Sequence, residues 1–196
     1  MNQDITIISN NCIAGFLYQD FYLSYRSPTV GFQFTQDGFV DFCADYQKYL
    51  ELPITPHPNP SEAEFQSLGG KTMDFPVGQL GDLTLYLQHY QSVAEADTAW
   101  KRRATRINSS KMLYIFMVYP DTANSIVRDF HSLPLKHRLN LSLNHQREEP
   151  ECIPIYSGNQ GWYDQDPATR MPYYWQYDYM SWIQNCLQDD LEPIEP

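Results

Sequence analysis

The sequence predicts a three-layer α/β fold, in which a mainly parallel sheet carries helices on both faces. Short apolar segments alternate with amphipathic helical segments along most of the chain, which is typical of this class. One segment, Lys111–Val118 (KMLYIFMV), is apolar almost throughout, as expected of a central strand buried on both faces. The chain has 196 residues, of which 42% are hydrophobic, enough to bury a substantial core.

The N-terminal part contains two predicted strand–helix pairs. Asp4–Ser9 is a predicted strand and Ile13–Tyr25 a predicted helix. After the Ser27-Pro28 break, Thr29–Phe34 is predicted as a second strand. Asp37–Leu50 is predicted to be a helix because its apolar residues recur at helical spacing, at Phe39, Phe42, Cys43, Tyr46 and Leu50. Cys43 is therefore expected in the core.

A proline-rich stretch follows the second predicted helix. Prolines at positions 53, 56, 58 and 60 disfavour a helix or a central strand. With Gly69-Gly70 downstream, residues 53–75 are predicted to form a mobile flap or an insertion.

The C-terminal part continues the alternation. Ser92 and Glu95 form a predicted capping box at the start of a helix. The predicted strands are Leu83–Leu87, Lys111–Val118, Arg138–Leu143 and, at an edge, Ile153–Tyr156, and the predicted helices are Ser92–Asn108, Asp121–Leu133 and Tyr174–Leu187. Residues 1–188 are thus predicted to form a single α/β domain, and residues 189–196 an acidic flexible tail.

Charge and composition exclude several classes of partner. A net charge of −11 argues against general nucleic-acid binding. No run of about 18 apolar residues exists, so no membrane span is expected. The N-terminus lacks the pattern of a signal peptide, and the four cysteines form no CxxC pair. We therefore expect a cytoplasmic protein with reduced thiols.

The junction of the first strand and helix is the first candidate site. Cys12 lies there, where the helix dipole and free N–H groups lower a thiol's pKa. His89 also follows a predicted strand, and the carboxyl ends of parallel strands share one edge of a sheet. We predict Cys12 and His89 as a nucleophile–base pair, with Asn10, Asn11 and Asp82 as candidates to orient the imidazole and contact the substrate. The alternative is that Cys12 is a buried core residue.

Three arginines on one predicted helix form the second candidate. Arg102, Arg103 and Arg106 stand out in a chain with only 13 basic residues. Guanidinium groups bind phosphates and carboxylates bidentately, which predicts an anionic small-molecule or glycan-precursor substrate. The alternative is that they complement the helix dipole.

A metal site is not predicted. Asp164-Gln165-Asp166 has a D-x-D form that holds divalent metals on sugar diphosphates, but a turn before Pro167 explains it adequately. No Walker, dinucleotide-binding or zinc-binding pattern is present, so no cofactor is expected.

Several segments together resemble a known bacterial family of unknown function. They are IISNNCIAGFLYQDF, YRSPTVGFQF, FPVGQLGDLTLYLQHY, EADTAWKRRATRIN, LPLKHRLNLS and DYMSWIQN. Members of that family are often labelled exopolysaccharide-biosynthesis or capsule proteins. The resemblance implies an α/β fold and a polysaccharide context, without an activity. A fainter likeness to papain-like cysteine peptidases of bacteria would match Cys12, His89 and the Arg102/Arg103 region.

Three functional hypotheses follow. The first is a transferase, acyl or glycosyl, acting on surface-polysaccharide precursors through Cys12, His89 and the arginine helix. The second is a non-catalytic protein of the same pathway that binds glycans or nucleotide sugars. The third is a papain-like Cys/His hydrolase. The sequence leaves them open, together with the oligomeric state.

Overall fold

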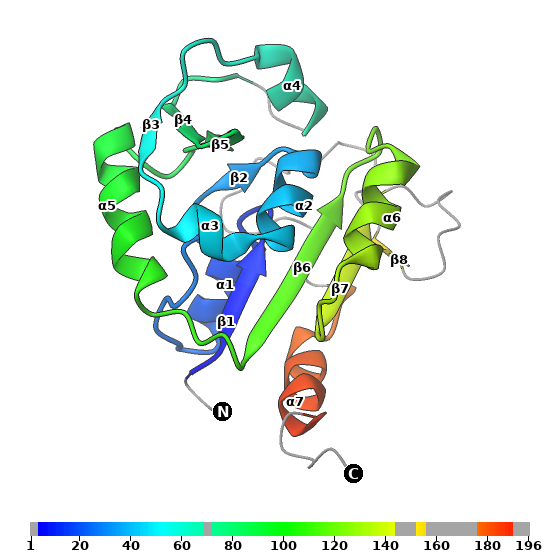
Figure 1. Ribbon diagram of the computed structural model, residues 1–196. Helices are drawn as coiled ribbons and strands as arrows, with labels where there is room; N and C mark the ends of the chain where they lie inside the picture. The colour runs from blue at the N-terminus through cyan, green and yellow to red at the C-terminus, as the bar shows by residue number, and fades with distance from the viewer. Residues whose placement is uncertain (1–3, 69–71, 144–151, 156–175, 190–196) are drawn as a thin grey trace.

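The structure is a computed structural model that describes residues 4–68, 72–143, 152–155 and 176–189 (Figure 1). Its first sheet is parallel, with strand order β1-β6-β7-β8. These strands are β1 (Thr6–Ser9), β6 (Met112–Val118), β7 (Arg138–Ser142) and β8 (Cys152–Pro154). The longest strand, β6, lies inside the sheet and is buried throughout, as its apolar sequence predicts.

The second sheet is antiparallel, with strand order β2-β5-β4-β3. Its strands are β2 (Gln33–Phe34), β3 (Ile54–Pro56), β4 (Val77–Leu80) and β5 (Leu83–Tyr86). The α/β class with a parallel sheet is confirmed, the antiparallel sheet was not expected, and the three-layer arrangement stays a prediction. Gly81 adopts a φ of 64°, and Leu80 pairs directly with Leu83, so a two-residue turn folds β4 back on β5. A turn this short enforces antiparallel pairing.

Seven helices are described. They are α1 (Ile13–Asp20), α2 (Gln36–Ala44), α3 (Tyr46–Leu50), α4 (Glu62–Ser67), α5 (Val93–Ala104), α6 (Asn124–Ser132) and α7 (Tyr179–Asp189). The helix predicted over 37–50 is split at Asp45, whose backbone is non-helical and whose side chain caps α3 by accepting from the Lys48 N–H. One of the two hydrogen bonds of the predicted α5 capping box is present: the Ser92 hydroxyl accepts from the Glu95 N–H.

The proline-rich stretch contains regular structure. It forms β3, at an edge of the second sheet, and the short helix α4. An edge strand tolerates proline because one side of it needs no ladder hydrogen bond. Helix α5 packs against β3, and the Asp97 carboxylate accepts from the Ile54 N–H at 2.9 Å. The absence of regular structure that the prolines at 53–60 predict is therefore wrong for residues 54–56, whereas the flap or insertion over 53–75 stays a prediction.

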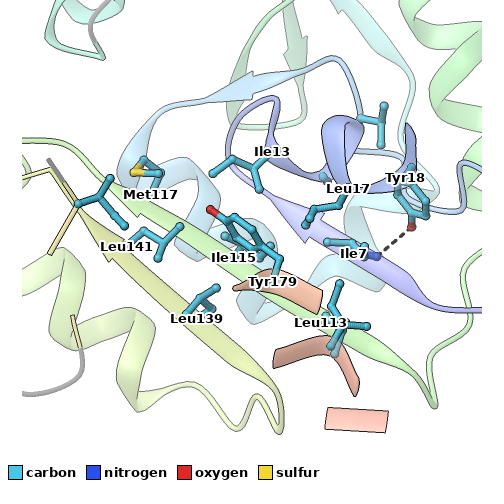
Figure 2. Close-up of a cluster of buried hydrophobic side chains, with 14 of the residues drawn as sticks. Ile7, Ile13, Leu17, Tyr18, Leu113, Ile115, Met117, Leu139, Leu141 and Tyr179 are labelled. Atoms are coloured by element: carbon cyan, nitrogen blue, oxygen red, sulfur yellow. Dashed lines mark hydrogen bonds between the residues drawn. The ribbon is translucent and has the colours of Figure 1, made fainter. Parts of the chain in front are cut away.

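The core is divided between the two faces of β6. Leu113, Ile115 and Met117 point toward α1 and α7, where they pack with residues such as Leu17 and Tyr179 (Figure 2). Tyr114, Phe116 and Val118 join a second cluster with α2, α5, α6 and the antiparallel sheet. The alternation of side chains along one strand thus builds both clusters. No helix among the described residues is long and apolar enough to cross a membrane.

Candidate functional site

Cys12 lies at the turn from β1 into α1, where it occupies the N-cap position. Its own side chain caps nothing. The Asn11 side-chain oxygen accepts from the Ile13 N–H at 3.1 Å, and the Ser9 hydroxyl accepts from the Ala14 N–H at 3.2 Å. These neighbours satisfy N–H groups at the helix terminus, which leaves the Cys12 thiol free to point elsewhere.

His89 lies beside this thiol, although the two residues are 77 positions apart. The distance between Cys12 Sγ and His89 Nε2 is 3.1 Å. His89 follows β5 of the antiparallel sheet, so the two residues come from different sheets, contrary to the shared parallel edge that the sequence suggested. The Phe34 N–H, which donates to the Asn10 carbonyl at 3.0 Å, joins the second sheet to the end of β1.

Burial sets the protonation of the pair. Removal of the sulfur from water raises the pKa of the Cys12 thiol to about 11, the opposite of the expected lowering by the helix terminus. Burial also lowers the pKa of the His89 imidazole, although part of the residue remains exposed. Both shifts favour the uncharged thiol and imidazole over a thiolate–imidazolium ion pair in the resting protein.

A pocket of about 590 Å³ opens beside the pair. Helices α1 and α5 form two of its walls, and the segments around Tyr25, Val30 and Tyr90 complete it. The lining residues are Cys12, Gly15, Phe16, Gln19, Tyr25, Val30, Gly31, His89, Tyr90, Glu95, Thr98, Ala99, Arg102 and Arg103. The volume is in the range of small-molecule sites.

Two of the three predicted arginines line this pocket. Arg103 is 8% exposed, and its Nη1 donates to the Tyr90 hydroxyl at 2.7 Å and to the Val30 carbonyl. Its guanidinium carbon lies 5.3 Å from the centre of the Tyr25 ring. Arg102 is exposed at the pocket wall. Arg106 does not line the pocket; its Nη1 donates to the Tyr25 carbonyl at 3.3 Å.

The other predicted site residues have structural contacts. The Asn10 side chain is fully buried, donates to the Met117 carbonyl and accepts from the Met117 N–H, both at 2.9 Å. Asn11 is buried and caps α1. Asp82 lies at the β4–β5 turn, 3.6 Å from Lys48 Nζ, and does not line the pocket. No hydrogen bond to the other imidazole nitrogen of His89 is found among the described residues.

Sequence reasoning missed Tyr25, Tyr90 and Gln19. The Gln19 side-chain amide donates to the Tyr25 hydroxyl at 3.0 Å, which extends the polar lining toward the C-terminal end of α1. Tyr90 follows His89 in the chain, and this position next to a candidate base could have predicted that it lines the site. Tyr25 lies beyond the end of α1, and only the fold brings it to Arg103.

The described part of the chain contains no group of three or more His, Cys, Asp or Glu side chains placed to hold a metal ion. Asp164 and Asp166, the D-x-D pair, lie outside the described residues, as does the acidic segment 190–196.

Comparison with known proteins gives a family without an activity. Residues 1–184 match the family described as "Domain of unknown function (DUF1919)". A protein of Haemophilus influenzae described as "Uncharacterized protein" is 25% identical over 138 residues, which are 70% of this chain and 61% of that relative. Neither description names a reaction, so a functional argument must start from the site itself.

Proposed function

We propose that this chain, which belongs to the DUF1919 family, transfers acyl groups through a covalent intermediate on Cys12. The observation that carries the proposal is the 3.1 Å contact between Cys12 Sγ and His89 Nε2 at the wall of a pocket of substrate size. A thiol within hydrogen-bond reach of an imidazole is the minimal arrangement for nucleophilic catalysis by cysteine.

The neutral resting pair defines how the first step proceeds. The Cys12 sulfur attacks the carbonyl carbon of an acyl donor while the thiol proton moves to His89 Nε2. The imidazolium then gives this proton to the leaving group as the bond from the acyl carbon to that group breaks. A thioester on Cys12 and a neutral imidazole remain.

The second step decides between transferase and hydrolase. An acceptor hydroxyl or amine, or water, attacks the thioester as its proton passes to His89 Nε2. The proton returns to the departing Cys12 sulfur, which restores the thiol. We propose a cytoplasmic transferase with a surface-polysaccharide precursor as acceptor, because the sequence resembles proteins labelled with exopolysaccharide biosynthesis. Water as acceptor gives the hydrolase.

The test is to trap the thioester. Purified protein is incubated with p-nitrophenyl acetate and, separately, with an acetyl thioester, and each cysteine is examined by mass spectrometry. We expect one acetyl group on Cys12, released by hydroxylamine, and no adduct in Cys12→Ser. Divided by the thiolate fraction of each variant, the acylation rate should be at least tenfold lower in His89→Ala. The buried Cys43 is the internal control. Equal acetylation rates per thiolate with and without His89 would contradict the proposal.

A non-catalytic binding protein is the second candidate, and one observation favours it. A thiol with a pKa of about 11 is almost entirely protonated at neutral pH, as in an unreactive cysteine. This alternative predicts that no donor acylates Cys12, while ligands still bind in the pocket.

A further inference from the structure

Arg103 is a buried cation without an acidic partner among the described residues. The ion pairs in that part of the chain are Arg26–Asp4, Lys48–Asp82 and Lys101–Asp97, and none involves Arg103. Its Nε is buried and has no hydrogen-bond partner there. A buried guanidinium that meets only neutral oxygens has given up water without gaining a counter-charge, which is costly.

The surroundings of Arg103 hold it in one orientation. The Tyr90 hydroxyl and the Val30 carbonyl accept from Nη1, and the guanidinium carbon lies over the Tyr25 ring. The Tyr90 hydroxyl also donates to the Val30 carbonyl at 3.0 Å. With both Nη1 protons engaged and Nε buried, this fixed guanidinium leaves its Nη2 protons for an oxyanion.

Arg102 adds a second positive charge to the same wall. It is exposed, lines the pocket and has no ion pair within the described residues. Among the described residues that line the pocket, the one acid is Glu95, whose carboxylate accepts from the Gln91 N–H at 2.9 Å at the other end of α5. The two arginines therefore give one end of the pocket a positive charge in a chain with a net charge of −11.

The arginines and the thiol line different parts of the pocket. Arg102 and Arg103 lie in the last turn of α5, and Tyr25 links Arg103 to Gln19 near the C-terminal end of α1. Cys12 precedes the first turn of α1. A substrate that fills the pocket can therefore meet the Cys12 thiol and the arginines with different groups.

We propose that Arg103 and Arg102 form an oxyanion subsite that binds a phosphate or carboxylate of the substrate, in the same pocket as the Cys12 thiol. This inference rests on the proposed acyl transfer for the identity of the reacting end. The substrate class is then an acyl compound that also carries an anionic group. Arg103 supplies the fixed Nη2 donor, and Arg102 supplies the exposed charge that attracts the anion.

Direct binding tests the subsite without reference to Cys12 chemistry. Inorganic pyrophosphate and succinate are titrated into the full chain by calorimetry at low salt. We expect at least one of them to bind, with a Kd raised tenfold or more by Arg102→Gln and by Arg103→Lys, which keeps the charge but not the planar guanidinium that Tyr90 and Val30 hold in place. Lys101→Gln is the matched control, because it removes one charge from an exposed position of the same helix that does not line the pocket. The tighter probe distinguishes a phosphate site from a carboxylate site.

Two outcomes overturn the subsite: neither anion binds the unaltered chain, or Arg102→Gln and Lys101→Gln weaken binding equally. A second measurement separates this failure from that of the acyl-transfer proposal. Cys12 is modified with the anionic reagent 5,5′-dithiobis(2-nitrobenzoate) and with the neutral 4,4′-dithiodipyridine. The subsite is supported if the anionic reagent modifies Cys12 faster than the neutral one in the unaltered chain and loses this higher rate in Arg102→Gln. If anions bind but no donor acylates Cys12, only the acyl-transfer proposal is refuted.

Discussion

Cys12 and His89 meet across the boundary between the two sheets, with Sγ and Nε2 3.1 Å apart. Cys12 follows β1 of the parallel sheet, and His89 follows β5 of the antiparallel sheet. The geometry of the pair therefore depends on how the sheets are joined. The contacts at that boundary, from Asn10 to Phe34 and from Tyr90 to Val30, connect segments far apart in the sequence.

Alkylation of Cys12 should depend strongly on pH. With a thiol pKa of about 11, the rate of reaction with iodoacetamide should be low at pH 7 and rise roughly tenfold per pH unit until near that value. Cys43, which is buried and has a raised pKa, should react only after unfolding. The rates of alkylation of Cys12 and Cys43 between pH 6 and 11, followed by mass spectrometry, check this prediction.

The response to His89→Ala separates a neutral pair from an ion pair. Without the imidazole ring, water reaches the sulfur, so the apparent pKa of Cys12 should fall toward the ordinary thiol value. An ion pair would behave in the opposite way. Rapid labelling of the unaltered chain at pH 6–7, with a higher apparent pKa in His89→Ala, would show that the resting thiol is ionised.

Two substitutions at Gly15 should separate an effect on stability from an effect on substrate access to Cys12. It lies in the first turn of α1 and lines the pocket, and a Cβ atom there would meet Val30 Cγ1 at 3.5 Å, an ordinary contact. Gly15→Ala should raise the free energy of unfolding by about 0.5–1 kcal/mol because alanine favours the helix. Gly15→Leu should fill the space beside the pair and slow acylation of Cys12 at least tenfold. Urea unfolding and acylation rates check the two effects, and equal acylation of both variants would mean that substrate does not pass Gly15.

The sequence predicted the parallel sheet well because its strands carry strong local signals. Lys111–Val118 is apolar after its first residue, and the observed β6 covers that apolar part. The antiparallel sheet was harder to predict, because β2 and β3 are two and three residues long and β3 contains Pro56. Strands so short owe their pairing to the neighbours that the fold supplies, and no periodicity marks them.

The candidate site was predictable in its residues but not in its geometry. Cys12 at a strand–helix junction and His89 after a strand are visible in the sequence, yet the expectation of a shared parallel edge was wrong. The pKa of Cys12 depends on the side chains that cover the sulfur, which sequence position does not reveal. Asn10 looked like a site residue because it is polar and adjacent, whereas its amide bonds the backbone of β6.

Asn10→Ala should destabilise the fold without removing a site residue. It leaves the buried N–H and carbonyl of Met117 unpaired, and each such group costs about 1–3 kcal/mol. We expect the free energy of unfolding in urea to fall by at least about 2 kcal/mol. Asn11→Ala is the comparison, since it removes one hydrogen bond, from the Ile13 N–H at the start of α1, and should cost about 0.5–1.5 kcal/mol. A smaller loss for Asn10→Ala than for Asn11→Ala would show that water or other groups replace the amide.

Tyr90→Phe should test whether the position of Arg103 matters for binding. The change removes the hydroxyl that accepts from Arg103 and donates to Val30, but keeps the ring that packs 4.9 Å from Phe32. The loss of a hydrogen bond to a charged group should lower the free energy of unfolding by about 1.5–3 kcal/mol. Arg103 would retain its charge and lose part of its fixed orientation, so pyrophosphate or succinate should bind several-fold more weakly.

Tyr114→Phe is the matched control for Tyr90→Phe. Tyr114 is also buried, but its hydroxyl donates only to the Met112 sulfur at 3.5 Å, and it lies outside the pocket. Its loss should change the stability little and leave anion affinity as it was, because a thioether is a weak acceptor. If both variants weakened anion binding alike, the effect would come from general loosening of the core, and Arg103 would need no precise placement by Tyr90.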